Sequence, residues 1–198
     1  MAISPDIALV HVSLDDTQPP IWRRFATPVT TSLKGLHDLV QAAMGWQDYH
    51  LWQFDTAQRR YGVPDPDYVT APPTIRASGV KIATLIARGE LALTYTYDFG
   101  DNWRHTIRIE GIETAQPQLT YPAFIDGEGR CPPEDVGGTS GFEDFLDAAA
   151  KPRHPEHHTV LDWYGDPFDP QDINRQMIDL RFGQIARRRR NQTIGVSR

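Results

Sequence analysis

This sequence has a single cysteine, and it lacks long apolar runs and the pattern of a signal peptide. Its single cysteine, Cys131, cannot form a disulfide within the chain, which is typical of proteins from a reducing compartment. No apolar stretch approaches the roughly 20 residues that a membrane-spanning helix needs. The first ten residues, MAISPDIALV, lack the basic start and cleavage signature of a signal peptide. These absences predict a cytoplasmic protein without a membrane partner.

Several catalytic signatures are missing as well. The sequence contains no glycine-rich phosphate-binding loop of either common kind. It also contains no Gly-x-Ser-x-Gly nucleophile motif and no cysteine–histidine nucleophile pattern. These gaps argue against nucleotide-dependent enzymes and against hydrolases that use a serine or cysteine nucleophile.

Acidic side chains outnumber basic ones, and the two kinds are unevenly distributed along the chain. Residues 1–180 carry 14 basic and 26 acidic side chains, whereas residues 181–198 carry six arginines and no acid. We therefore expect a single domain over residues 1–180 and a basic C-terminal tail over 181–198, the end of the last helix followed by disorder. The acidic body repels polyanions, so only the tail, through Arg187, Arg188, Arg189 and Arg190, is expected to contact DNA or an acidic partner.

The hydrophobic periodicity predicts an α+β fold with a mixed or antiparallel sheet and packed helices. Alternation predicts strands at 7–14, 19–28 and 50–56 and a central hairpin over about 91–112, and helical spacing predicts helices at 32–46, 80–90 and through most of the segment from 141 to 190. The proline-rich segment 62–79 is long for a connection without structure, and we interpret it as a mobile flap.

The turn of this hairpin lies in the stretch YDFGDNWRH, residues 97–105, which has two interpretations. In the first it is only a turn: Gly100 supplies a positive φ, and Asp98 or Asn102 bonds to the local backbone. In the second, Asp98, Asp101 and His105 provide oxygen and nitrogen ligands for a divalent metal ion. Asp101 and His105 could also form a catalytic acid–base pair.

A second dense stretch, CPPEDVGG at residues 131–138, holds two more carboxylates. Two prolines and two glycines constrain the chain around Glu134 and Asp135. If this loop meets the hairpin turn, Asp98, Asp101, Glu134 and Asp135 form a carboxylate cluster that needs a cation, such as Mg²⁺ or Mn²⁺, or raised pKa values. If a basic side chain lies there instead, the same residues form a salt-bridge network.

The alternative to a metal site is a binding groove between this turn, the 131–138 loop and the 62–79 flap. Trp103, Tyr97, His37 and His50 are its candidate lining residues. His37 borders the apolar face of the 32–46 helix, which also suits an ordinary core histidine, and His50 could approach it across the turn that follows.

Several stretches together resemble the plasmid pRiA4b ORF-3-like family. They are PPIWRR (19–24), LHDLVQAAMGW (36–46), HLWQF (50–54), YTYDFGDNWRH (95–105), YP (121–122), CPPEDVGG (131–138) and LDWYGDPFDP (161–170). The resemblance implies a domain with a curved sheet. Some members are labelled resolvase-like passenger (TnpR-like) proteins of insertion elements, but the residue sets of serine and tyrosine recombinases are not evident here.

Two functions follow as expectations. The first is a binding or adaptor domain linked to mobile-element DNA transactions, in which the dense motifs serve recognition. The second is a metal-dependent hydrolase acting on phosphodiesters, in which the four carboxylates hold the metal and His105 is a ligand or activates water.

Overall fold

The computed structural model describes residues 6–65 and 72–195 and confirms the α+β class. Its open sheet has the strand order β5-β4-β3-β6-β7-β1-β2-β8. Neighbouring strands pair antiparallel except β4 and β5, which run parallel. The strands are β1 (Asp6–Leu14), β2 (Ile21–Pro28), β3 (Trp52–Asp55), β4 (Arg60–Gly62), β5 (Thr74–Arg76), β6 (Ala92–Tyr97), β7 (Trp103–Thr114) and β8 (Ala123–Glu128).

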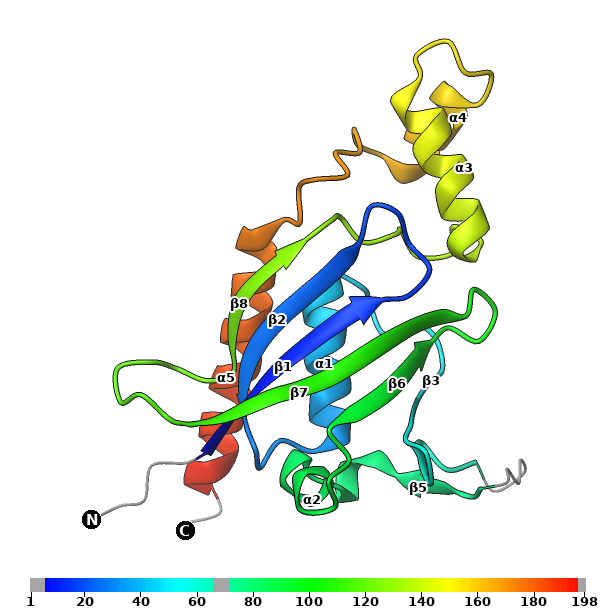
Figure 1. Ribbon diagram of the computed structural model, residues 1–198. Helices are drawn as coiled ribbons and strands as arrows, with labels where there is room; N and C mark the ends of the chain where they lie inside the picture. Colours follow the sequence, from blue (N-terminus) through cyan, green and yellow to red (C-terminus); the bar gives the residue numbers. More distant parts are fainter. Residues whose placement is uncertain (1–5, 66–71, 196–198) are drawn as a thin grey trace.

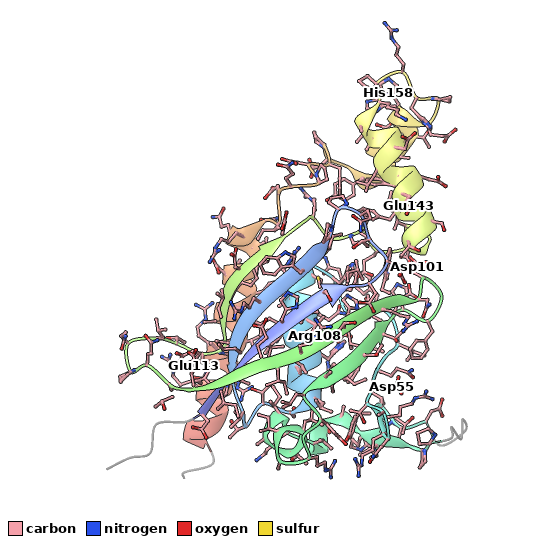
Figure 2. The ribbon with its side chains drawn as sticks, in the orientation of Figure 1. Asp55, Asp101, Arg108, Glu113, Glu143 and His158 are labelled. Carbon is pink, nitrogen blue, oxygen red and sulfur yellow. The ribbon has the colours of Figure 1, made fainter. Side chains whose placement is uncertain are left out.

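Two helices cover one face of this sheet (Figure 1), and β7 carries polar side chains on the opposite face. Along β7 the side chains of Trp103, His105, Ile107 and Ile109 are buried, as the alternation predicts. Arg108 lies on the opposite, solvent-exposed face, where Figure 2 labels it. An antiparallel sheet with one wet face shows this alternation.

The helix α1 (Leu33–Met44) begins and ends as its sequence predicts. The Ser32 hydroxyl accepts a hydrogen bond from the Gly35 amide at 3.1 Å, which caps the first turn. Gly45 ends the helix with a φ of 91°, a conformation that glycine adopts without steric cost. The apolar face of α1 packs into the main core.

The remaining helices are η1 (Ala77–Gly79), α2 (Ile82–Ala87), α3 (Gly138–Ala150), α4 (His157–Tyr164) and α5 (Arg175–Gly195). In Figure 1, α3 and α4 project beyond one end of the sheet, while α5 lies beside β8 and α1. Within the part of the chain that the structure describes, no helix is long and apolar enough to cross a membrane.

The expected boundary at residues 180/181 falls inside α5. Phe182 is buried against the rings of Phe25 and Phe124, and Ala186 is buried one turn later. The helix therefore continues through the arginine run as part of the folded body up to Gly195.

Residues 74–79, the last part of the expected 62–79 flap, are not a loop. They form β5, which pairs with β4 at the edge of the sheet, and η1, which contacts α1. The middle of the expected flap, residues 66–71, lies outside the described residues. The short strand and η1 supply the backbone hydrogen bonds that a long loop would leave to water.

Candidate metal centre

The 97–105 turn is built by two residues in the left-handed conformation. They are Asp98 and Asn102, with φ values of 53° and 56°, so the prediction that Gly100 supplies the positive φ is wrong. Aspartate and asparagine tolerate this conformation because their short side chains can bond to the nearby backbone. Oδ1 of Asp98 accepts a hydrogen bond from the Gly100 amide at 2.8 Å.

The 131–138 loop does meet this turn. Oδ2 of Asp101 accepts a hydrogen bond from the backbone amide of Gly137 at 3.1 Å. Gly138 approaches so closely that an added Cβ would lie 2.8 Å from the Asp101 carbonyl oxygen, and its φ is +69°. Figure 2 accordingly shows Asp101 at the tip of the hairpin, beside the first turn of α3. The positive φ of Gly137 (+95°) and of Gly138, and the close approach at Gly138, favour glycine at both positions.

Four side chains gather behind this contact, and we call His50, Asp98, Glu134 and Asp135 the His50 cluster. Nε2 of His50 lies 3.1 Å from Oδ1 of Asp135, 3.6 Å from Oδ2 of Asp98 and 3.9 Å from Oε2 of Glu134. This nitrogen is buried, yet it makes no hydrogen bond of acceptable geometry. One ligand atom each from His50, Asp98 and Asp135 lies within 4.8 Å of the other two.

The pairing of β3 with β6 produces this cluster. Trp52 pairs with Tyr97, so His50, two residues before Trp52, lies level with the turn that follows Tyr97. The Asp98 amide donates to the Leu51 carbonyl at 2.9 Å and continues that pairing. This end of the sheet thus places His50, which precedes β3, beside Asp98, which follows β6.

Glu134 borders the His50 cluster and is positioned by two hydrogen bonds. Its Oε1 accepts hydrogen bonds from the Gln47 amide at 2.8 Å and from the Tyr97 hydroxyl at 3.1 Å. Burial raises the pKa of Glu134 above its ordinary value. Burial also raises the pKa of Tyr97, and the negative charge of Glu134 adds to that rise, so Tyr97 keeps its proton and acts as a donor.

In the described residues, no lysine or arginine forms an ion pair with the three carboxylates of the His50 cluster. The Asp135 side chain is 67% exposed and that of His50 is 27% exposed, so the cluster opens to solvent on the Asp135 side. Imidazole nitrogen and carboxylate oxygen bind a metal ion at about 2.0–2.2 Å. The ligand atoms of one ion must therefore lie within a few ångström of one another, as those of His50, Asp98 and Asp135 do.

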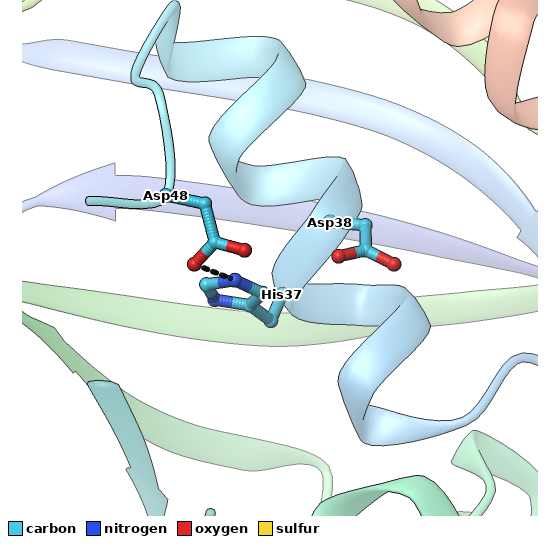
Figure 3. Close-up of side chains that lie close together, drawn as sticks. All are labelled: His37, Asp38 and Asp48. Atoms are coloured by element: carbon cyan, nitrogen blue, oxygen red, sulfur yellow. Dashed lines mark hydrogen bonds and ion pairs between the residues drawn. The ribbon is translucent and has the colours of Figure 1, made fainter. Parts of the chain in front are cut away.

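A second group, the His37 cluster, comprises Lys34, His37, Asp38 and Asp48 and lies on and beside α1; Figure 3 draws its histidine and two aspartates. His37 bonds to the Tyr95 hydroxyl through Nδ1 and to Asp48 through Nε2, both at 2.8 Å. The Lys34 ammonium lies 2.7 Å from Asp38 and 3.3 Å from Asp48. This cluster already contains a fixed cation, and burial lowers the pKa of His37 to about 4.

His105 lies deeper than an acid–base role would require. It is 0% exposed, its ring contacts Trp46 and Tyr95, and burial lowers its pKa to about 4. Its Nδ1 lies 3.1 Å from the Trp103 carbonyl oxygen. β7 begins at Trp103, so the face that His105 shares with Trp103 is the core face, while Asp101 belongs to the turn.

The expected groove residues are distributed between the core and the His50 cluster. Trp103 and His37 are buried in the core, and Tyr97 reaches the cluster only with its hydroxyl group. His50 belongs to the cluster as a potential ligand. Sequence reasoning missed that role because only the β3–β6 register, not the sequence spacing, places His50 next to Asp98.

The arginine run also has a definite position. Arg187, Arg188 and Arg190 are exposed on α5, whereas Arg189 is partly buried and donates to the Thr31 hydroxyl at 2.8 Å. The run is thus anchored beside the start of α1 rather than extended away from the body.

Comparison with known proteins agrees with this fold. The family model described as plasmid pRiA4b ORF-3-like protein matches residues 6–177. The uncharacterized protein y4hQ of Sinorhizobium fredii is 35% identical over 182 residues, covering 91% of this chain and 92% of that one. The crystal structure of the protein of unknown function MM3350 from Methanosarcina mazei superposes with a TM-score of 0.78 at 30% identity, covering 85% of this chain and 95% of the other. The chain belongs to the plasmid pRiA4b ORF-3-like family.

Proposed function

We propose that this member of the plasmid pRiA4b ORF-3-like family binds a divalent metal ion at the His50 cluster. The observation that carries the proposal is the buried Nε2 of His50, which faces three carboxylates without making a hydrogen bond. A metal ion would use this nitrogen as a ligand and would neutralise the carboxylates around it.

The donor set favours a first-row transition metal. Imidazole suits Zn²⁺ and Fe²⁺, while carboxylates suit Mg²⁺, Ca²⁺ and Mn²⁺. His50, Asp98 and Asp135 form the inner ligand set, with Glu134 as a fourth group held by Tyr97 and Gln47. We therefore expect Mn²⁺ or Zn²⁺ to bind more tightly than Mg²⁺.

Metal-dependent hydrolysis of a phosphodiester is the second candidate. The observation that favours it is the exposed side of Asp135, which would leave coordination positions of the metal open to water and substrate. A metal in such a site lowers the pKa of its bound water and creates a nucleophile. A colorimetric phosphodiester such as bis(4-nitrophenyl) phosphate, offered to the metal-loaded protein, tests this candidate directly.

The adaptor role in mobile-element DNA transactions is a separate expectation, and it would depend on the arginines of α5. We also expect a cytoplasmic location, because Cys131 is free and buried, as is usual in a reducing compartment.

Thermal unfolding against a panel of divalent metals, with EDTA as reference, tests metal binding. At a metal concentration about 100-fold above Kd, binding to the native state adds about 2.7 kcal/mol, which raises Tm by several degrees. We expect the rise to disappear in His50→Gln and in Asp98→Asn. The asparagine can still cap the turn through its side-chain oxygen, so this variant keeps the fold.

Asp38→Asn in the His37 cluster is the matched control, because it removes one carboxylate near a histidine without touching the His50 cluster. It should keep the full metal-dependent rise in Tm. A wild-type protein whose Tm does not respond to any of the metals, or a response that survives in Asp98→Asn, would contradict the proposal.

A further inference from the structure

A second feature lies away from the His50 carboxylates, between α1 and α5. These helices pack beside each other on the same side of the sheet (Figure 1). Between them runs a groove with a volume of about 1200 Å³, lined by Lys34 of α1 and by Arg181, Arg188 and Arg189 of α5. Most small-molecule pockets measure about 300–1,000 Å³, so the groove can take a segment of a polymer.

The charge of this groove is opposite to that of the body. Four cations line it, together with two carboxylates, Asp38 and Asp48, and both of these are already in contact with the Lys34 ammonium. From Arg181 to the end of the chain the sequence contains no acidic residue. The acid of α5, Asp179, lies 3.6 Å from Arg175 and does not line the groove, so it does not neutralise the arginines on the α5 side.

The arginines are arranged along one side of α5. With 3.6 residues per turn, Arg181, Arg188 and Arg189 point towards the groove, whereas Arg187 and Arg190 point to the opposite side. Arg181 donates to the Trp46 carbonyl at 2.9 Å, and Arg189 donates to the Thr31 hydroxyl at 2.8 Å, so both side chains are held in place. Seven residues of helix separate Arg181 from Arg188 by roughly 10 Å along the axis.

We propose that the groove between α1 and α5 binds the phosphodiester backbone of single-stranded nucleic acid. Guanidinium groups bind phosphate through paired hydrogen bonds, and a row of them along a helix follows a repeating anionic chain. Trp46 borders the groove but is 3% exposed, and its indole donates to the Pro132 carbonyl, so it offers no stacking surface for bases. Binding is therefore directed at the backbone and is independent of base sequence.

A single strand fits this surface better than a duplex. Residues 1–180 carry 26 acidic and 14 basic side chains, so a wide, densely charged duplex would be repelled by the body around the groove. A single strand can enter the groove and keep its charge close to the arginines.

Fluorescence anisotropy with a labelled oligothymidylate, recorded in EDTA over a range of salt concentrations, tests the proposal. EDTA removes any contribution of a metal at the His50 cluster, so the two proposals can fail independently. We expect Arg181→Gln/Arg188→Gln to weaken binding about tenfold or more and to reduce the slope of log K against log salt by about 1.4, because two phosphate contacts are lost.

The matched control is Arg187→Gln/Arg190→Gln, which removes the same charge from the other side of the same helix. We expect it to change the affinity by less than about threefold. Because Arg181 also contacts Trp46, a second test avoids it. Gln184, an exposed residue that lines the groove, is changed to lysine or to glutamate, and the two variants should tighten and weaken binding respectively.

Four results would overturn the proposal. Equal losses in the two double-arginine variants would mean that only net charge matters. Absence of oligonucleotide binding by the wild type, or stronger competition by polyglutamate than by unlabelled oligothymidylate, would assign the groove to another ligand or none. Tighter binding of a duplex of the same length would contradict the single-strand preference.

Discussion

The His37 cluster and the His50 cluster have almost the same residue types but different electrostatics. Each contains a histidine and at least two carboxylates, and in each the ligand atoms lie within 4.8 Å of one another. In the His37 cluster both ring nitrogens make hydrogen bonds, of which Figure 3 shows the one to Asp48, and Lys34 bridges the two aspartates. In the His50 cluster the facing nitrogen makes no hydrogen bond.

The comparison teaches that residue types and spacing are insufficient to identify a metal site. The ammonium of Lys34 occupies the place that a cation would take, and its i,i+4 spacing from Asp38 follows from the helix that carries both. The His50 cluster gathers its groups from the segment before β3, a turn and a loop, and it opens to solvent. On the proposal made above, the internally neutralised His37 cluster has a structural role, whereas the incomplete His50 cluster is completed by a metal ion.

The largest expected effect is a difference in the free energy of unfolding between alanine variants of the two histidines. His37→Ala should lower the free energy of unfolding by about 3 kcal/mol, because it removes a buried ring stacked on Trp52 and leaves the Tyr95 hydroxyl without that partner. His50→Ala, measured in EDTA, should cost about 1 kcal/mol or less. Urea unfolding of both variants provides the comparison, and equal losses would show that the two clusters have the same structural role.

Smaller changes in stability, of opposite sign to each other, are expected for a matched pair of aspartates, one from each cluster. Asp48 and Asp135 both have a positive φ, near 59° and 58°, which asparagine also tolerates. Asp48→Asn should cost about 1 kcal/mol, since it breaks the contacts with Lys34 and His37. Asp135→Asn in EDTA should leave stability unchanged or raise it by up to about 0.5 kcal/mol, because it removes one of three neighbouring negative charges.

Urea unfolding of the Asp48→Asn and Asp135→Asn variants tests this expectation. If Asp135→Asn destabilises the metal-free protein as much as Asp48→Asn does, then the His50 cluster is already compensated within the protein. In that case the comparison between the clusters, and with it the argument for a metal, would fail.

The smallest effect concerns Asp101, which was a candidate ligand on sequence grounds. In the structure its carboxylate accepts from the Gly137 amide, and an asparagine oxygen can accept the same bond. Asp101→Asn should therefore change stability by less than about 0.5 kcal/mol. Its metal-dependent rise in Tm should equal that of the wild type, and loss of that rise would place Asp101 among the ligands.

Much of the fold could be predicted from local patterns. The α+β class, the hairpin of β6 and β7, and the cap of α1 at Ser32 all follow from alternation, helical spacing and capping chemistry. These signals depend on neighbours within a few residues, so they are present in the sequence itself. The flap and the 180/181 boundary relied on composition, which does not report pairing with β4 or the burial of Phe182.

The candidate site was only partly predictable. The sequence identified Asp98, Glu134 and Asp135 as unusual acids in constrained segments, and it identified the hairpin turn as their platform. It could not show that the 131–138 loop reaches that turn, because the contact between Asp101 and Gly137 joins residues 36 positions apart. It also placed Asp101 and His105 together, which the start of β7 at Trp103 prevents.

The sequence by itself therefore determined β1, β2, β3, the β6–β7 hairpin, the approximate positions of the helices, the family resemblance and the segments rich in acids. Only the tertiary structure revealed the pairing of β4 with β5. It also decided which cluster is neutralised by Lys34 and which is left open, and which arginines of α5 face α1. The physical reason is the distance along the chain over which each signal acts. Secondary structure depends mainly on short-range periodicity, whereas charge balance depends on side chains that converge in space from the segment before β3, the hairpin turn and the loop before α3.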